Sequence, residues 1–251
     1  MLVKRAMRTS NPALNSGTFE GVSAQPGQTM TINGTVNKTA VLLVLVTCGA
    51  VFTWQEFTTS PDKAAPWIVA GGIGGFIVAL ITCFKKSIAG FTAPLYAVLE
   101  GLLLGGVSAM YETRFHGIVF QAVVLTFGTL LALLLAYRSG LIRATENFKL
   151  GVFAATGAIA LLYLVGFVLS FFKIGIPYIH ESGLVGIGFS VFVVVIAALN
   201  LVLDFDFIEQ GAQQGVPKYM EWYAGFGLLV TLVWLYLEIL RLLAKLASRR
   251  D

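Results

Sequence analysis

The sequence predicts an all-α, polytopic integral membrane protein, a single bundle of seven transmembrane helices. Three observations predict this class. First, 57% of the 251 residues are hydrophobic and only 12% are charged, about half the charged fraction of a soluble domain. Second, apolar runs of roughly 20 residues recur along the chain, and each is long enough to cross about 30 Å of hydrocarbon. Third, the breaks between these runs span only about 4–18 residues, too few for a second domain.

The chain divides into two predicted parts. Residues 1–38 are polar and contain Gly, Pro, Ser and Thr throughout, so we expect a flexible N-terminal tail. Residues 39–251 form the transmembrane domain. Its expected spans are 39–57, 66–84, 88–110, 118–137, 151–172, 184–203 and 222–246.

Local signals support several of these spans. Pro66 and Trp67 open the second span with a proline suited to a first helical turn and an aromatic suited to the membrane interface. Glycines four residues apart share a helix face and let another backbone approach closely. Such pairs occur in the second span, at Gly71 and Gly75, and in the stretch EGLLLG of the third. We therefore expect these helices to pack tightly.

The last two spans differ in character. The sixth is a long apolar run that closes on the acidic stretch LVLDFDFIEQG. The seventh contains AGFGLLVTLVW, whose small and apolar residues suit contact on every side. We therefore expect the last helix to be buried among the others.

The positions of Lys and Arg predict the orientation, because basic residues concentrate in cytoplasmic loops. Ten of the 17 fall on the N-terminal side of the expected topology and three in the opposite loops, with four more near the C-terminus. This places the N-terminus in the cytoplasm and, after seven crossings, the C-terminus outside. A re-entrant span that leaves both ends inside is the alternative. The net charge of +4 arises from these loops and tails and requires no nucleic acid.

Glu100 is the most informative single residue, since it lies near the centre of the third span, about 18 Å from the span's start. An ionised carboxylate at that depth costs several kcal/mol, so it must face protein or water, or carry a proton. Two interpretations follow. Glu100 is either a neutral acid that hydrogen-bonds a neighbouring helix, or a proton or cation site.

Two acids belong to the last span. Glu238 lies roughly 12 Å before its end, and Arg241 and Lys245 lie near the same helix face. A local ion pair is therefore the alternative to a role for Glu238 in a cation pathway. Glu221 starts the same span, where the helix N-terminus favours a negative charge, so helix capping is its alternative role.

Three more acids, Asp204, Asp206 and Glu209, follow the sixth span, and we expect them at the C-terminal end of that helix. Positions two apart differ by about 200°, so Asp204 and Asp206 face different directions, whereas Asp206 and Glu209 share a face. The helix C-terminus and the low dielectric both disfavour an ionised carboxylate. We therefore expect a carboxyl here to titrate near neutral pH, as a pH gate requires. A solvated acidic loop is the alternative.

The sequence gives no sign of an enzyme or of a bound cofactor. It contains no His cluster and no HExxH or GxSxG motif. Cys48 and Cys83 lie in apolar segments, without the spacing of a disulfide framework or a metal site. We therefore expect no catalysis and no resident metal.

Three stretches resemble the Bax inhibitor-1 family, also called the transmembrane Bax inhibitor motif family, in its bacterial branch. They are TMTINGTVNKTAVLL, PLYAVLEGLLLG and EWYAGFGLLVTLVWLYLEILRLL. The order of polar tail, seven closely spaced spans and an acid ending the sixth extends the resemblance over most of the chain. It implies a seven-helix fold with the last helix central. It also implies a calcium leak that responds to pH through two aspartates, one on the sixth and one on the seventh helix.

The resemblance carries over only in part. Asp204 matches the sixth-helix aspartate, which relatives hold in an FDTQ-like stretch, and Asp206 falls where that stretch has its Gln. The seventh-helix aspartate has no match, because Thr231 lies near the expected position. Either Glu238 or Glu100 then replaces it, or the pair is absent.

Together these patterns predict a pH-sensitive calcium or cation leak channel. Ca²⁺ is the expected permeant ion, and protons are expected to modulate the channel. Hard cations take oxygen ligands, which the acids supply. One alternative is an interaction protein that regulates a membrane protease or a stress response, in which residues 1–38 act. Another is a proton-coupled transporter. The expected partners are the lipid bilayer, Ca²⁺ and protons, with a protease or other membrane protein in the first alternative. The expected location is the bacterial cytoplasmic membrane.

Overall fold

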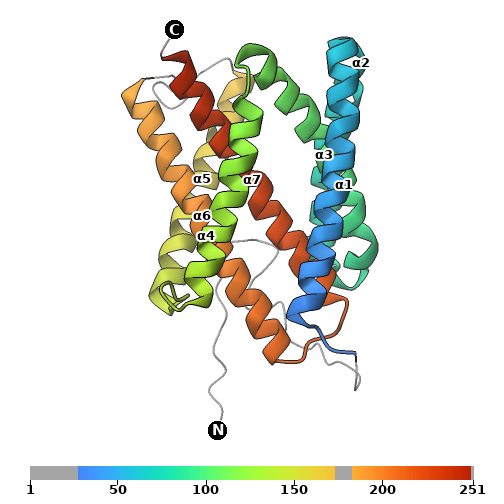
Figure 1. Ribbon diagram of the computed structural model, residues 1–251, viewed down its shortest axis with the longest axis vertical. Coiled ribbons are helices and arrows are strands. Elements are labelled where there is room, and N and C mark those ends of the chain that lie inside the picture. The colour runs from blue at the N-terminus through green and yellow to red at the C-terminus, as the bar shows by residue number, and fades with distance from the viewer. Residues whose placement is uncertain (1–27, 173–182, 250–251) are drawn as a thin grey trace. The chain divides into compact units, whose positions relative to one another are not determined.

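The computed structural model describes residues 28–172 and 183–249. Within these ranges the chain forms seven long α-helices, one short 3-10 helix and no β-strand (Figure 1). The elements are α1 (Ile32–Thr59), α2 (Pro61–Phe84), η2 (Lys86–Ile88), α3 (Ala89–Arg114), α4 (Ile118–Arg138), α5 (Glu146–Phe171), α6 (Leu184–Gln213) and α7 (Met220–Ser248). All seven α-helices are long and apolar enough to cross a membrane. The predicted class, an all-α polytopic membrane protein, is confirmed.

The first two helices begin earlier than predicted. Thr31 caps α1 by accepting a hydrogen bond from the Gly34 N–H, so residues 32–38, which we expected in the tail, are helical. Residues 1–27 of that tail lie outside the described part of the chain. Helix α2 begins at Pro61, and Pro66 therefore lies inside the helix rather than at its start.

The sixth helix ends later than predicted, and this corrects the argument about its acids. Helix α6 continues to Gln213, so Asp204 lies nine residues, about 14 Å, before its end. The helix continues because Phe205, Phe207 and Ile208 are buried and keep packing. The unpaired carbonyls of a helix belong to its last turn, so a C-terminal dipole does not act on Asp204.

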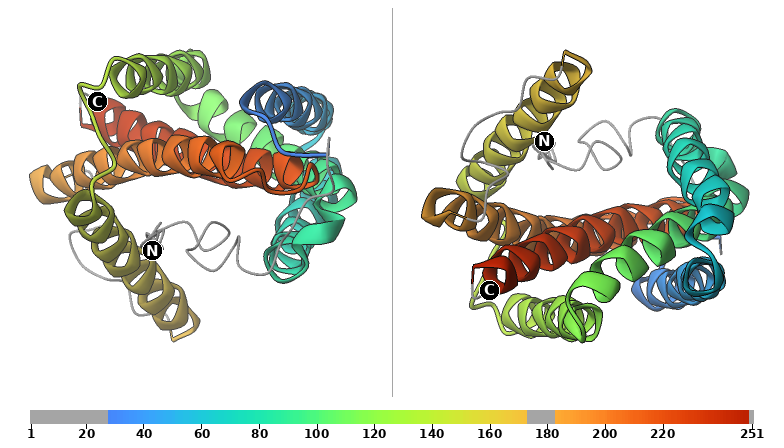
Figure 2. Two further views of the ribbon diagram at one scale, coloured as in Figure 1. Left: turned by 90° about the horizontal axis from the view of Figure 1, so that it is seen from below. Right: turned by 90° about the horizontal axis from the view of Figure 1, so that it is seen from above.

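The chain divides into two compact units. Unit 1 holds α1, α2, η2 and α3 together with residues 206–230. Unit 2 holds α4 and α5 together with residues 184–205 and 231–249. Helices α6 and α7 each contribute residues to both units, and Figure 2 shows both as ribbons without a break.

Unit 1 is organised around α3, which packs against both α1 and α2 (Figure 1). Glycines make this packing very close. A methyl group on Gly101 would overlap the carbonyl of Val46 in α1, and one on Gly105 would overlap the carbonyl of Ala50. A methyl group on Gly71 of α2 would overlap the backbone of α3. The predicted close approach of these helices through their glycines is confirmed.

Helix α7 is the most buried of the seven helices, with 61% of its most apolar 18-residue window inside the protein. In unit 1 its first part contacts α3, where the rings of Tyr96 and Phe226 meet edge to face at 5.0 Å. There it also contacts α1, where Gly225 packs against Thr39. In unit 2 its second part hydrogen-bonds Tyr163 of α5. Each part of α7 therefore packs against other helices of its own unit, and the burial expected for the last helix is confirmed.

Candidate functional site

Glu100 lies 11 residues into α3 and is only 8% exposed. Tyr96, one helical turn earlier, is also buried, and its hydroxyl hydrogen-bonds the Glu100 carboxyl. On the other side, Gly75 of α2 faces the carboxyl, and a Cβ at that glycine would lie 3.3 Å from Glu100 Oε2. Glu100 thus lies between a hydroxyl of its own helix and the backbone of α2, all within unit 1.

This environment explains what Glu100 is able to do. An ionised carboxylate inside a membrane span costs several kcal/mol, and one hydrogen bond to the charged group offsets about 1.5–3 kcal/mol of that, which is only part of the cost. The charge therefore needs a proton, a cation or water as a partner. The Tyr96 hydroxyl is a suitable neighbour for proton exchange, because it both donates and accepts hydrogen bonds.

Asp204 belongs to unit 2 and is fully buried in α6. Asn200 precedes it by one turn on the same helix face and is 2% exposed. The Asn200 amide donates to Thr156 Oγ1 of α5 at 2.9 Å and to the Ile196 carbonyl at 2.8 Å. Asn200 is a buried polar residue that sequence patterns did not predict as part of the site. The feature that marks it in the sequence is an amide within an apolar run, one helical turn before an acid.

Asp206 and Glu209 lie in unit 1 and are partly exposed. The Asp206 carboxylate accepts a hydrogen bond from Gln210, and the Glu209 carboxylate accepts one from Gln213 at 3.2 Å. Both are contacts between positions four apart on α6. The two acids therefore share the more exposed face of this helix, as the spacing predicted, whereas Asp204 is on the buried face.

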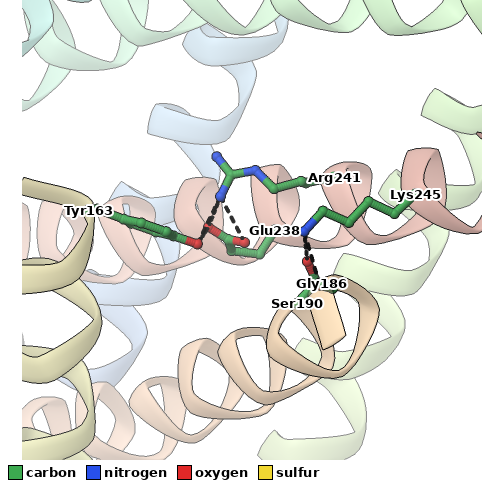
Figure 3. Close-up of polar contacts among 6 residues, drawn as sticks. All are labelled: Tyr163, Gly186, Ser190, Glu238, Arg241 and Lys245. Atoms are coloured by element: carbon green, nitrogen blue, oxygen red, sulfur yellow. Dashed lines mark hydrogen bonds and ion pairs between the residues drawn. The ribbon is translucent and has the colours of Figure 1, made fainter. Parts of the chain in front are cut away.

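Glu238 forms the ion pair that the sequence suggested as its alternative role. Figure 3 shows Glu238 and Arg241 of α7 meeting Tyr163 of α5. The Arg241 guanidinium lies 3.0 Å from Glu238 Oε1 and donates to the Tyr163 hydroxyl at 2.8 Å, and that hydroxyl donates to Glu238 at 2.9 Å. Glu238 is 2% exposed. The Arg241 guanidinium therefore balances the charge of Glu238, and the Tyr163 hydroxyl hydrogen-bonds both side chains, all within unit 2.

Lys245 lies one turn beyond Arg241 and is 7% exposed. Its ammonium donates to the Gly186 carbonyl at 3.0 Å and to Ser190 Oγ at 2.9 Å, both in the first two turns of α6 (Figure 3). A lysine amid the apolar residues at the end of the last span was the only sequence signal for this contact. Thr231, placed near the family's second aspartate, is buried in the same unit at 3% exposure.

Glu221 lies in the first turn of α7, as predicted, but its hydrogen bonds join it to the start of α1 in unit 1. Glu221 Oε1 accepts from the Thr31 N–H at 3.1 Å and from Thr31 Oγ1 at 3.0 Å. Beside this contact the Met30 N–H donates to the Val216 carbonyl at 2.7 Å, and Thr29 forms an isolated β-bridge with Pro217. Residues 28–31 are thereby held against the connection between α6 and α7.

The candidate acids are spread over α3, α6 and α7. In the described part of the chain, no group of three or more His, Cys, Asp and Glu side chains is close enough to hold a metal ion. The carboxyl groups therefore lie separately along the membrane spans. Among the described residues of either unit they form no cluster that could coordinate a cation.

Seven helices that are long and apolar enough to span a membrane, with carboxyl groups buried inside them, define a polytopic helical membrane protein. The family model described as Bax inhibitor 1 like matches residues 11–248, which is nearly the whole chain. The chain belongs to this family. No curated protein and no solved structure matches it.

Proposed function

We propose that this protein is a pH-sensitive calcium leak channel of the Bax inhibitor-1 type. The observation that carries the proposal is the burial of two carboxyl groups, Glu100 and Asp204, inside membrane-spanning helices. Ionisable groups are rare in such helices and commonly mark ion or proton pathways. Carboxylate oxygens are also the ligands that Ca²⁺ prefers. Family membership supports the same assignment.

The acids differ in their proposed roles. Glu100, within unit 1, lines the cation path, and Asp204, within unit 2, is the pH-sensitive carboxyl whose protonation lowers the flux. Glu238 has a structural role at the end of α7, because Arg241 and Tyr163 compensate its charge. Asp206 and Glu209, on the more exposed face of α6, supply negative charge near the mouth of the path. No catalytic step is involved.

We also propose that the membrane is the bacterial cytoplasmic membrane and that the N-terminus lies in the cytoplasm. The excess of basic residues on the N-terminal side supports this orientation. Reporter fusions after Asp251 test it. A reporter active only outside the cytoplasm supports the orientation, and one active only inside contradicts it.

Calcium entry into liposomes that contain the purified protein tests the proposed activity. We expect entry that does not saturate with Ca²⁺ in the manner of a carrier and that falls as the pH is lowered, because protonation removes the negative charge that attracts the cation. Protein-free liposomes and liposomes with the Glu100→Gln, Asp204→Asn double variant are the controls. Calcium entry equal to that of the protein-free liposomes at every pH contradicts the proposal, as does saturable uptake of a small solute coupled to protons.

A further inference from the structure

We infer that residues 28–31 form a detachable strap that holds the connection between α6 and α7, and that detachment of this strap raises calcium entry. The inference rests on the proposed function for its flux readout, and a labelling readout is independent of that function. The strap, the end of α6 from residue 206, the connection at residues 214–219 and the start of α7 all belong to unit 1.

The strap pairs with the connection through its backbone. The Met30 N–H donates to the Val216 carbonyl at 2.7 Å. On the other side of the pair, the Lys218 N–H donates to the Gln28 carbonyl at 3.0 Å. These two hydrogen bonds point in opposite directions, which is the pattern between antiparallel strands. The strap therefore binds the connection as one short strand binds another.

Thr29 and Pro217 lie opposite each other between these hydrogen bonds and form an isolated antiparallel β-bridge. Neither hydrogen bond uses the backbone nitrogen of these two residues, so the pairing tolerates a proline here. The Cα atoms of such a pair lie about 4.5 Å apart. A disulfide joins Cα atoms about 4.4–6.8 Å apart, so this pair is suited to a cross-link.

The end of α6 positions the acceptor for the strap. Gly215 has a positive φ of 64°, and its N–H donates to the Ala212 carbonyl at 3.2 Å. The Val216 N–H turns back to the Gly211 carbonyl at 3.3 Å. These two bonds after a left-handed glycine form a Schellman motif, a common helix ending. The N–H of Val216 thus closes α6, and its carbonyl accepts the strap.

Two side chains fasten the strap further. Met30 is only 2% exposed, whereas Thr29 and Thr31 on either side of it are exposed. The N–H and the hydroxyl of Thr31 both donate to Glu221 in the first turn of α7, at 3.1 and 3.0 Å. The strap therefore ties together the start of α1, the end of α6 and the start of α7.

The position of the strap gives it a regulatory role. It can detach without unfolding a helix, because α1 begins only at Ile32. While it is attached, three helix ends are tied together and cannot separate to admit a hydrated cation. Asp206 and Glu209, which we place near the mouth of the path, lie in the last turns of α6, the helix whose end the strap holds. The attached strap is therefore the state of low calcium entry.

Thiol labelling measures detachment in the full-length protein, held in lipid nanodiscs that leave both membrane faces open. The background carries Cys48→Ala and Cys83→Ala, which remove the two native thiols. A charged maleimide reaches Met30→Cys only while the strap is detached, whereas Ile32→Cys is the matched control because Ile32 is 48% exposed. We expect Met30→Cys to react to completion but about tenfold or more slowly, since two backbone hydrogen bonds exceed the roughly 1.4 kcal/mol of that factor.

A disulfide between Thr29→Cys and Pro217→Cys tests the effect on flux in the same background. Calcium entry into liposomes is measured after the pair is oxidised and again after reduction with dithiothreitol. We expect entry to fall to the level of protein-free liposomes in the oxidised protein and to return on reduction, because the disulfide keeps the strap attached. Each single cysteine variant is a control and should not respond to the oxidant.

Met30→Ser tests the opposite change. We expect calcium entry to rise about tenfold, because burial of a methionine side chain contributes at least the roughly 1.4 kcal/mol that this factor represents. Ile32→Ser, two residues along the chain at an exposed position, is the matched control and should conduct at the wild-type rate. If Met30→Ser does not fold, the oxidised and reduced forms of the cysteine pair still decide.

The outcomes separate this inference from the proposed function. Equal calcium entry through the oxidised and reduced pair, or higher entry through the oxidised pair, overturns the inference. So does wild-type entry through folded Met30→Ser. A Met30→Cys thiol that is never labelled, or is labelled as fast as Ile32→Cys, contradicts a strap that detaches. Absence of calcium entry in every protein contradicts the proposed channel, and the labelling rates then still decide whether the strap detaches.

Discussion

Thr31 and Glu221 hydrogen-bond twice although 190 residues separate them in the chain. Thr31 caps α1, and Glu221 is in the first turn of α7, so a single carboxylate lies at two helix N-termini. A negative charge at such a position is favoured by both helix dipoles. The carboxyl group also packs directly against Gly34. The contact joins the first and last helices within unit 1.

We therefore predict that Glu221→Ala destabilises the protein by about 2–4 kcal/mol, because it removes two hydrogen bonds to a charged group. Thermal unfolding in detergent measures the loss. Glu56→Ala, in the last turn of α1, is the control and should unfold near the wild-type temperature. Equal melting of the two variants would show that the Thr31 contact contributes nothing to stability.

Close helix packing leads to a second prediction. Gly105→Ala should destabilise the protein by about 1–3 kcal/mol, since the new methyl group overlaps the α1 backbone. Gly128→Ala is its matched control, because no atom lies within 4 Å of a Cβ at that position in α4. The control should be neutral or more stable by up to about 1 kcal/mol, as alanine is the better helix former. The order of the two melting temperatures decides the prediction, and the reverse order contradicts it.

We expect the substitutions of Glu238 and Arg241 to have non-additive effects on the free energy of unfolding, because the two side chains form an ion pair. Arg241→Met leaves the buried Glu238 carboxylate with only the Tyr163 hydroxyl, at a cost of about 3 kcal/mol. Adding Glu238→Gln removes the uncompensated charge, so the double variant should recover part of this loss. Chemical or thermal unfolding of the four proteins forms a double-mutant cycle. Strictly additive effects would mean that the two side chains do not stabilise each other.

The pH gate is tested at Asp204. Asp204→Asn should fold, because the amide mimics the neutral acid in a fully buried site, and should flatten the pH response of calcium entry. Asp206→Asn is the comparison for the pH response alone, since Asp206 is partly exposed and bonds Gln210 on its own helix, and we expect this variant to keep its pH dependence even where its total flux falls. Flux is measured in liposomes at several pH values. An unchanged pH profile in Asp204→Asn would move the gating role to Asp206 or Glu100.

The sequence was sufficient to find the seven helices, because apolar runs of about 20 residues have few alternatives in a bilayer. It located helix ends less well. The first two turns of α1 contain polar residues, so the apolar pattern predicted a start at residue 39 and not at Ile32. Thr31, a typical capping residue, marks the true start. The acids after residue 203 were interpreted as a helix end, whereas burial of Phe205 and Phe207 carries α6 to Gln213.

Most site contacts that the sequence did not predict join residues that lie far apart in the chain or pack from different helices. The spacing of Glu238 and Arg241 predicted their ion pair, because a helix brings positions three apart together. No spacing predicted Tyr163, which is 75 residues from Glu238 and reaches it only through packing of α5 on α7. Glu100 was selected by its depth in the span, whereas the Tyr96 hydrogen bond and Gly75 emerged only with the structure.

The central claim is that a carboxylate within the membrane forms part of a cation path, and the comparison of Glu100→Gln with Glu100→Asp tests it most directly. Calcium entry into liposomes and thermal stability are measured for both variants. Gln keeps the shape but removes the charge, so we expect a stable protein with calcium entry reduced about tenfold or more at a pH where Glu100 is ionised, since a charge in low dielectric contributes over 1.4 kcal/mol. Asp keeps the charge and should retain part of the flux. Full calcium entry through stable Glu100→Gln protein would contradict the account.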